Sequence, residues 1–78
     1  MDFVKIDGVF VKELENNPGD YAVVRSINEI GHYMGKQTIA EFVENDGILD
    51  QLKEIGVDYA QGYGIEKPCR LEDLRLAT

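Results

Sequence analysis

Short runs of β-branched and aromatic residues recur three times along the chain. Residues 2–6 (DFVKI) form the first run, which stops at Asp7 and Gly8, a pair typical of a turn after a strand. Residues 37–42 (QTIAEF) and residues 57–60 (VDYA) form the second and third runs. These three segments are predicted to be β-strands.

A helix is predicted between the first two strands. Asn17 is a candidate N-cap, Pro18 suits the first helical position, and Gly35 stands where a left-handed C-cap belongs. Between these limits apolar residues recur at helical spacing, which predicts one stripe packed against the sheet. The stripe consists of Val23, Ile27, Ile30 and Met34, with Val24 and Gly31 beside it.

A second helix is predicted between the second and third strands. Asn45 or Asp46 caps its start, and Gly56 ends it. Its buried stripe consists of Ile48, Leu49, Leu52 and Ile55.

The order strand, helix, strand, helix, strand predicts an α/β fold. Right-handed crossovers make such strands parallel and adjacent, with the helices on one outer face of the sheet. After the third strand, residues 61–64 (QGYG) are predicted to form a glycine-rich turn. A last short helical pattern holds Leu71, Leu74 and Leu76.

Composition narrows the possible functions. The chain has 78 residues, enough for one small domain, and its net charge of -7 gives no electrostatic basis for binding a nucleic acid polymer. A single cysteine, Cys69, excludes an internal disulfide and a metal site built from several cysteines. No apolar run reaches the roughly 20 residues of a membrane span. We therefore expect a cytoplasmic segment without membrane contact.

Polar residues gather where the predicted strands end. Lys5 and Asp7 close the first strand, Glu41 and Glu44 the second, and Gln61 the third. Because the carboxyl ends of parallel strands meet at one rim, these groups form a set suited to a divalent metal and a phosphate. The alternative interpretation is structural, since strand ends are exposed and 29% of the chain is charged.

Three blocks of the sequence resemble consecutive motifs of the EAL domain family, the bacterial phosphodiesterases that linearise cyclic di-GMP. The blocks are residues 2–8 (DFVKIDG), residues 38–44 (TIAEFVE) and residues 59–63 (YAQGY), the last followed by Lys67 and Pro68. One departure is Phe42, where the family most often has glycine. A side chain at this strand end is expected to point outward.

The resemblance implies a partial (β/α)8 TIM-like barrel. EAL domains are modified barrels of roughly 250 residues, and residues 1–78 are similar to the C-terminal portion, with its last three parallel strands and intervening helices. Motifs of the first five strands, such as Glu-Ala-Leu or Asp-Asp-Phe-Gly, do not occur in the sequence. We expect such a piece to expose apolar surface and strand edges, and therefore to form homo-oligomers.

The resemblance also implies roles for individual residues. Glu41 matches the acid that helps to hold a catalytic Mg²⁺ or Mn²⁺ or its bound water, with the other ligands missing from this chain. Lys5 matches the lysine that stabilises charge near the phosphate and the attacking water. Glu44 and Gln61 match supporting groups that orient ligands or waters. Asp7 is either an acid on the ligand side or a turn-forming residue before Gly8.

The implied function is part of a cyclic di-GMP phosphodiesterase that produces linear pGpG, with the isolated chain expected to be inactive. The alternative is a degenerate EAL module that senses cyclic di-GMP or binds another protein without catalysis. A parent protein of either kind can carry GGDEF or sensory domains, or a membrane tether outside this segment.

Overall fold

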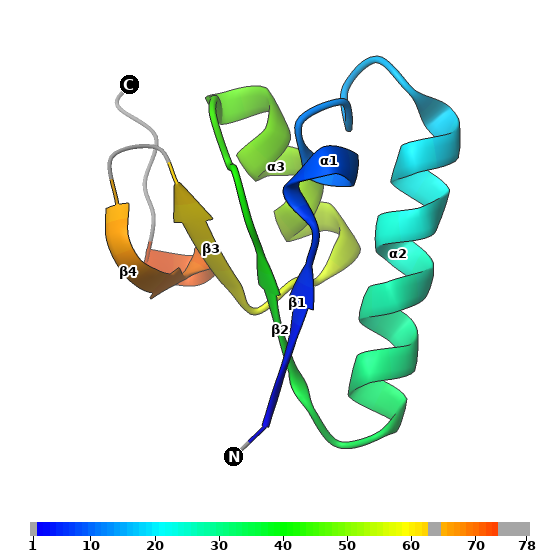
Figure 1. Cartoon of the computed structure of the whole chain (residues 1–78), viewed down its shortest axis with the longest axis vertical. Helices are drawn as coiled ribbons and strands as arrows, with labels where there is room; N and C mark the ends of the chain where they lie inside the picture. Colours follow the sequence, from blue (N-terminus) through cyan, green and yellow to red (C-terminus); the bar gives the residue numbers. More distant parts are fainter. Residues whose placement is uncertain (1, 63–64, 74–78) are drawn as a thin grey trace.

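The computed structural model describes residues 2–62 and 65–73, which form a sheet covered by helices on one face (Figure 1). The sheet has four strands in the order β1-β2-β3-β4. The strands are β1 (Phe3–Ile6), β2 (Gln37–Ala40), β3 (Tyr59–Gly62) and β4 (Ile65–Arg70). The helices are α1 (Gly8–Val11), α2 (Pro18–Tyr33), α3 (Asp46–Ile55) and the 3₁₀ helix η1 (Leu71–Asp73).

Both long helices begin and end at the residues that the sequence predicts. The side chain of Asn17 accepts hydrogen bonds from the amides of Gly19 and Asp20 at the start of α2. In α3 the side chain of Asn45, the first of the two candidate caps, accepts from the amide of Ile48. The helices are followed by left-handed glycines, Gly35 with φ 77° and Gly56 with φ 98°.

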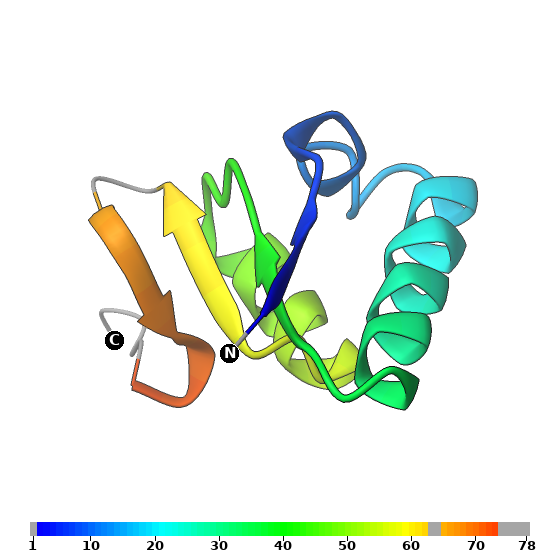
Figure 2. The same cartoon turned by 60° about the horizontal axis from the view of Figure 1, so that its bottom comes forward.

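The first three strands are parallel and adjacent, as predicted. β1 pairs with β2 in the register Lys5↔Ile39, and β2 pairs with β3 in the register Ile39↔Tyr59. Helices α2 and α3 lie on the same side of this sheet (Figure 2). The α/β class and the helices on one face are therefore confirmed.

The fourth strand was not predicted. The segment after the glycine-rich stretch was expected to lead into a helical pattern, but β4 pairs antiparallel with β3, in the register Ala60↔Cys69. Pro68 lies within β4, and proline is tolerated there because β4 is at the edge of the sheet. Only Leu71 of the predicted helical pattern is described, as the buried start of η1, and Leu74 and Leu76 lie outside the described residues.

One predicted helix face is wrong in part: Ile27 of the stripe packs against the core and Val24 and Gly31 beside it are buried, but the rest of the stripe is exposed. Val23, Ile30 and Met34 of α2 are 37%, 60% and 60% exposed, whereas the residues of α2 buried against the sheet are Val24, Asn28 and Gly31. The helix lies close to the sheet at Gly31, where a Cβ atom would come within 3.1 Å of the Thr38 methyl group. Val24, Asn28 and Gly31 therefore make the contact with the sheet, and Val23, Ile30 and Met34 face outward.

The core lies between the helices and the sheet. Ile6, Ala40 and Ala60 contribute one buried residue from each parallel strand, and Leu49 and Leu52 contribute from α3. The further members are Val11, Leu14, Val24, Val43, Ile48, Val57 and Leu71. None of the helices in the described part of the chain is long and apolar enough to cross a membrane.

Candidate active site

The C-terminal ends of the parallel strands β1, β2 and β3 lie together at one end of the sheet, at the top of Figure 1. We call this end the rim. Side chains alternate between the two faces of a strand. The Phe3 and Tyr59 rings meet edge to face with centroids 5.4 Å apart, so both lie on the face opposite the helices. By this alternation the side chains of Lys5, Ile39 and Gln61 lie on the same face as Phe3 and Tyr59. The candidate residues of the strands are therefore on the open face of the sheet.

Glu41 and Gln61 are brought together at the rim. They line a pocket of about 270 Å³ with Phe42 and Gly62. Both side chains are half-buried, and the amide of Glu41 donates to the carbonyl of Ile6 at 3.2 Å, which fixes its backbone to β1. A residue with a carboxylate and a residue with a neutral amide thus line the same pocket, and such groups can orient a water or a metal ligand.

Lys5 is on the same face but lower in the sheet. It pairs with Ile39, two residues before Glu41, and its side chain is exposed. Lys5 is not among the residues that line the pocket. The long side chain of a lysine can reach toward the rim from this position, since Lys carries its charge on a flexible four-carbon stem.

Asp7 and Glu44 flank the rim in loops. The carboxylate of Asp7 accepts from the amide of Val9 at 2.9 Å and so caps α1, which supports the turn-forming interpretation of this residue. Glu44 is exposed between β2 and α3, outside the pocket.

The described residues do not form a complete metal site. Residues 2–62 and 65–73 contain no group of three or more His, Cys, Asp or Glu side chains placed to hold a metal ion. At the rim, Glu41 and Gln61 offer one carboxylate and one amide oxygen, whereas Mg²⁺ prefers near-octahedral coordination by oxygen. The rim residues could supply only part of a metal shell.

Comparison of the sequence with models of protein families identifies the family of this chain. The model for the EAL domain matches residues 1–68, which is most of the chain. The chain belongs to the EAL domain family.

Relatives of this EAL chain include named phosphodiesterases. "Cyclic di-GMP phosphodiesterase PdeB" of Shewanella oneidensis is 51% identical over 83 residues, which cover 99% of this chain and 10% of PdeB. "Cyclic di-GMP phosphodiesterase PdeF" of Escherichia coli is 40% identical over 72 residues, covering 92% of this chain and 10% of PdeF. The chain thus spans about a tenth of the length of these curated relatives.

Solved EAL structures share the fold. The EAL enzyme Bd1971, solved with cAMP and cyclic di-GMP bound, superposes with a TM-score of 0.79 at 36% identity, covering 92% of this chain and 19% of that one. The EAL domain of Mycobacterium smegmatis DcpA gives a TM-score of 0.77 at 37% identity, covering 94% and 33%. The chain folds as part of the EAL domain's TIM-like barrel.

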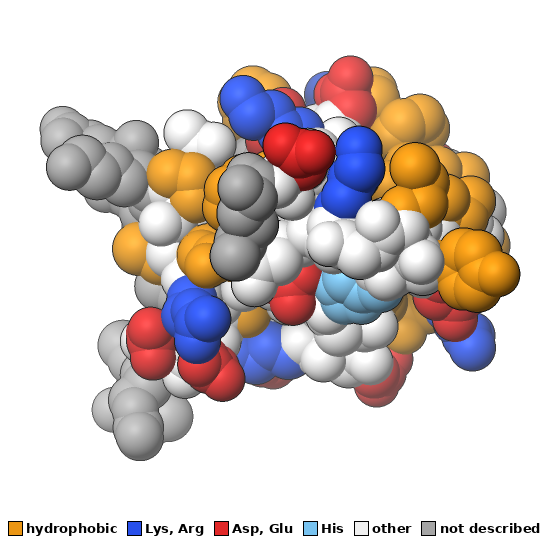
Figure 3. Space-filling model, turned by 90° about the horizontal axis from the view of Figure 1, so that it is seen from below, with side chains coloured by type: hydrophobic (Ala, Val, Ile, Leu, Met, Phe, Trp, Pro, Cys, Tyr) orange, Lys and Arg blue, Asp and Glu red, His pale blue; other side chains and the backbone are white. Residues whose placement is uncertain are grey.

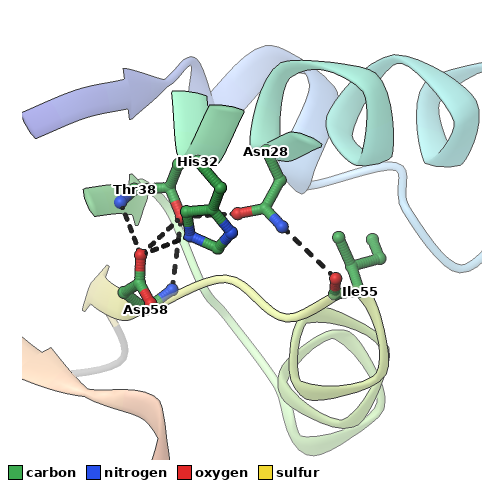
Figure 4. A network of polar contacts seen from close by, with 5 residues as sticks. All are labelled: Asn28, His32, Thr38, Ile55 and Asp58. Atoms are coloured by element: carbon green, nitrogen blue, oxygen red, sulfur yellow. Dashed lines mark hydrogen bonds and ion pairs between the residues drawn. The ribbon is translucent and has the colours of Figure 1, made fainter. Parts of the chain in front are cut away.

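The EAL chain carries a second group of polar residues at the other end of the sheet, which the sequence did not reveal. His32 Nε2 lies 2.6 Å from Asp58 Oδ2, and the amide of Thr38 donates to the same oxygen at 2.9 Å (Figure 4). The Thr38 hydroxyl donates to Asn28 Oδ1 at 2.6 Å, and Asn28 Nδ2 donates to the carbonyl of Ile55. The group joins α2, β2, α3 and the segment before β3.

This network shifts the titration of Asp58. Burial alone would raise the pKa of its carboxyl, but the hydrogen bonds from His32 and from the Thr38 amide outweigh burial and lower it below the ordinary 3.8. The His32 side chain is 38% exposed and is paired with Asp58.

Proposed function

We propose that this chain is the C-terminal portion, residues 1–78, of an EAL domain that hydrolyses cyclic di-GMP to linear pGpG. The observation that carries the proposal is the pairing of Glu41 and Gln61 in one rim pocket, with Lys5 on the same face of the sheet. The names of the relatives PdeB and PdeF support the substrate.

In this proposal Glu41 holds the catalytic metal or its water and acts as general base. Lys5 stabilises the charge that develops on the phosphoryl oxygens, and Gln61, Glu44 and Asp7 orient the surrounding groups. The metal is Mg²⁺ or Mn²⁺, which supplies an activated water when bound. Because one carboxylate binds such an ion weakly, the isolated chain is inactive and holds no metal tightly.

A chimeric enzyme tests this proposal. The segment of Shewanella PdeB that aligns with this chain is replaced by residues 1–78, and hydrolysis of cyclic di-GMP is measured with Mg²⁺. We expect the chimera to be active, and Glu41→Gln and Lys5→Met each to lower kcat by about 100-fold. Glu13→Gln is the matched control, since Glu13 is exposed in the loop between α1 and α2.

The same chimera distinguishes the proposed hydrolysis from the alternative function, sensing of cyclic di-GMP without catalysis. A folded chimera that binds cyclic di-GMP without hydrolysing it, in a PdeB that is active with its own segment, indicates a sensor module. Turnover by the isolated 78-residue chain, abolished by Glu41→Gln, would contradict the proposed inactivity of the chain alone.

The proposal extends to the surroundings of the chain. The isolated chain self-associates, because β1 exposes one edge and α2 exposes Val23, Ile30 and Met34. In this proposal the parent domain is cytoplasmic, cyclic di-GMP is its partner, and the parent protein can carry GGDEF or sensory domains. Size-exclusion chromatography with light scattering at micromolar concentrations tests the self-association.

A further inference from the structure

Phe42, directly after Glu41, has an unusual backbone. With φ 59° it is the only non-glycine residue with positive φ among the described residues. A left-handed conformation crowds the Cβ atom of any L-residue and is uncommon for a bulky one. Surrounding contacts must therefore hold Phe42 in this conformation.

The conformation of Phe42 reverses the direction of backbone hydrogen bonding. The amides of Gln37 and Glu41 both donate to β1, to the carbonyls of Asp2 and Ile6. In a continued strand the amide of Val43 would point the same way, since residues two apart are equivalent. Instead it donates to the carbonyl of Gln61 in β3, at 3.1 Å. Phe42 thus turns the chain from one neighbouring strand to the other.

The reversal also exchanges the faces of the side chains. Thr38 and Ala40 are buried under the helices, and Phe42 would continue on that face in a regular strand. After the turn it is Val43 that enters the core, 1% exposed, while Phe42 is 61% exposed at the rim. β2 therefore ends at Ala40 rather than at Phe42, and the expectation that Phe42 points outward is confirmed.

Phe42 is in contact with the start of α1, which follows β1, and with the end of β3. A Cβ atom on Gly8 would lie 1.8 Å from Cδ2 of Phe42, so the ring rests directly on the Gly8 backbone. A Cβ atom on Gly62 would lie 3.2 Å from Cα of Phe42 and 2.8 Å from the nitrogen of Val43. Because Gly8 and Gly62 have no side chains, they leave space for this turn.

We propose that Phe42 is a positioning residue for Glu41, an inference that rests on the proposed phosphodiesterase function. Its turn fixes the backbone on both sides of Glu41, through the bonds to Ile6 and Gln61. Its ring, lying on Gly8, fixes the start of α1, directly after Asp7, against the residue that follows Glu41. Phe42 itself does not take part in the reaction.

The turn and the ring can be tested separately. Phe42→Gly keeps a residue that adopts positive φ but removes the ring, and Phe42→Tyr keeps the ring. Gly8→Ala displaces the ring from the other side. Tyr33→Ala is the matched control, because Tyr33 is an equally removable aromatic, 93% exposed at the end of α2.

In the PdeB chimera we expect Phe42→Gly and Gly8→Ala to lower kcat about tenfold while KM changes less than about twofold. A displaced base slows the reaction without weakening substrate binding. For Phe42→Tyr, which keeps the ring, we expect kcat to stay within about twofold of that of the unmodified chimera. Unchanged kcat in Phe42→Gly would overturn the proposal, and so would a raised KM at constant kcat, which would place the ring against the substrate.

Amide hydrogen exchange in the isolated chain gives a readout that does not need activity. Phe42→Gly is expected to speed exchange of the Glu41 and Val43 amides about tenfold, Phe42→Tyr to leave it unchanged, and the Gln37 amide to serve as internal control. An inactive unmodified chimera refutes the proposed function alone. Equal protection of both amides in all variants refutes the positioning role.

Discussion

At the scale of single residues, the structure explains why a glycine is usual in the EAL family where this chain has Phe42. The position requires φ 59°, which glycine adopts without steric cost and other residues do not. Phe42 is compatible with it because the ring covers Gly8. Phe42, where the chain departs from the family pattern, therefore depends on Gly8, which leaves room for its ring.

This backbone requirement predicts an order of stability among variants. Phe42→Ala retains the left-handed strain and loses the ring, whereas Phe42→Gly loses both. We expect the glycine variant to be more stable than the alanine variant by about 1 kcal/mol in urea unfolding. The reverse order would mean that position 42 is not left-handed in solution. Ser26→Gly against Ser26→Ala, at an exposed site within α2, gives the opposite order and is the control.

At the scale of elements, the network around Thr38 and Asp58 fastens α2 and the segment before β3 to β2. Thr38 is fully buried, and its hydroxyl is the donor to Asn28 Oδ1. Thr38→Val leaves that oxygen without this donor, so we expect a loss of about 1–3 kcal/mol in the free energy of unfolding. Thr38→Ser keeps the hydroxyl and should lose less. Equal losses for both variants would assign the effect to packing alone.

The same network predicts a pH dependence. The pKa of Asp58 is lowered on folding, so its stabilising contribution is complete above the ordinary value of 3.8 and is lost as pH falls from there through the lowered value. Urea unfolding between pH 5 and pH 2.5, roughly the range in which a carboxyl with a lowered pKa titrates, should show a steeper loss for the unmodified chain than for Asp58→Asn. Parallel curves would contradict this contribution.

At the scale of the whole molecule, the outward stripe of α2 is the surface that the fold leaves uncovered. Apolar side chains gather on the right of Figure 3, on the side of α2, where Ile30, Tyr33 and Met34 are exposed. A stripe of this kind favours association because burial removes apolar surface from water.

Substitution of this stripe should change the association state. We expect Ile30→Lys and Met34→Lys to shift the isolated chain toward monomer in sedimentation velocity experiments, by at least about tenfold in dissociation constant, since a buried charge opposes association. Asn16→Lys adds the same charge at an exposed position in the loop between α1 and α2, outside the stripe, and should have little effect. Unchanged association in the Ile30 and Met34 variants would indicate that the chain associates through the exposed edge of β1 instead.

The sequence by itself determined the features that depend on local chemistry. Asn17, Asn45, Gly35 and Gly56 set the ends of the two long helices, because caps and left-handed glycines act within one turn of the chain. The three parallel strands followed from the order of the elements, and the EAL blocks identified the family. Glu41 and Gln61 were expected to meet because parallel strands end at a common rim, and they share a pocket.

Tertiary structure alone decided the features that depend on distant residues. Helical periodicity did not place the centre of the buried face of α2, because the close approach at Gly31 turns Val24, Asn28 and Gly31 toward the sheet. β4 depended on its pairing with β3, and the polar network on contacts between residues 10 to 27 positions apart, such as Thr38 with Asp58. The left-handed turn at Phe42 exists because Gly8 and Gly62 leave space for it, and that space is made only when three strands come together.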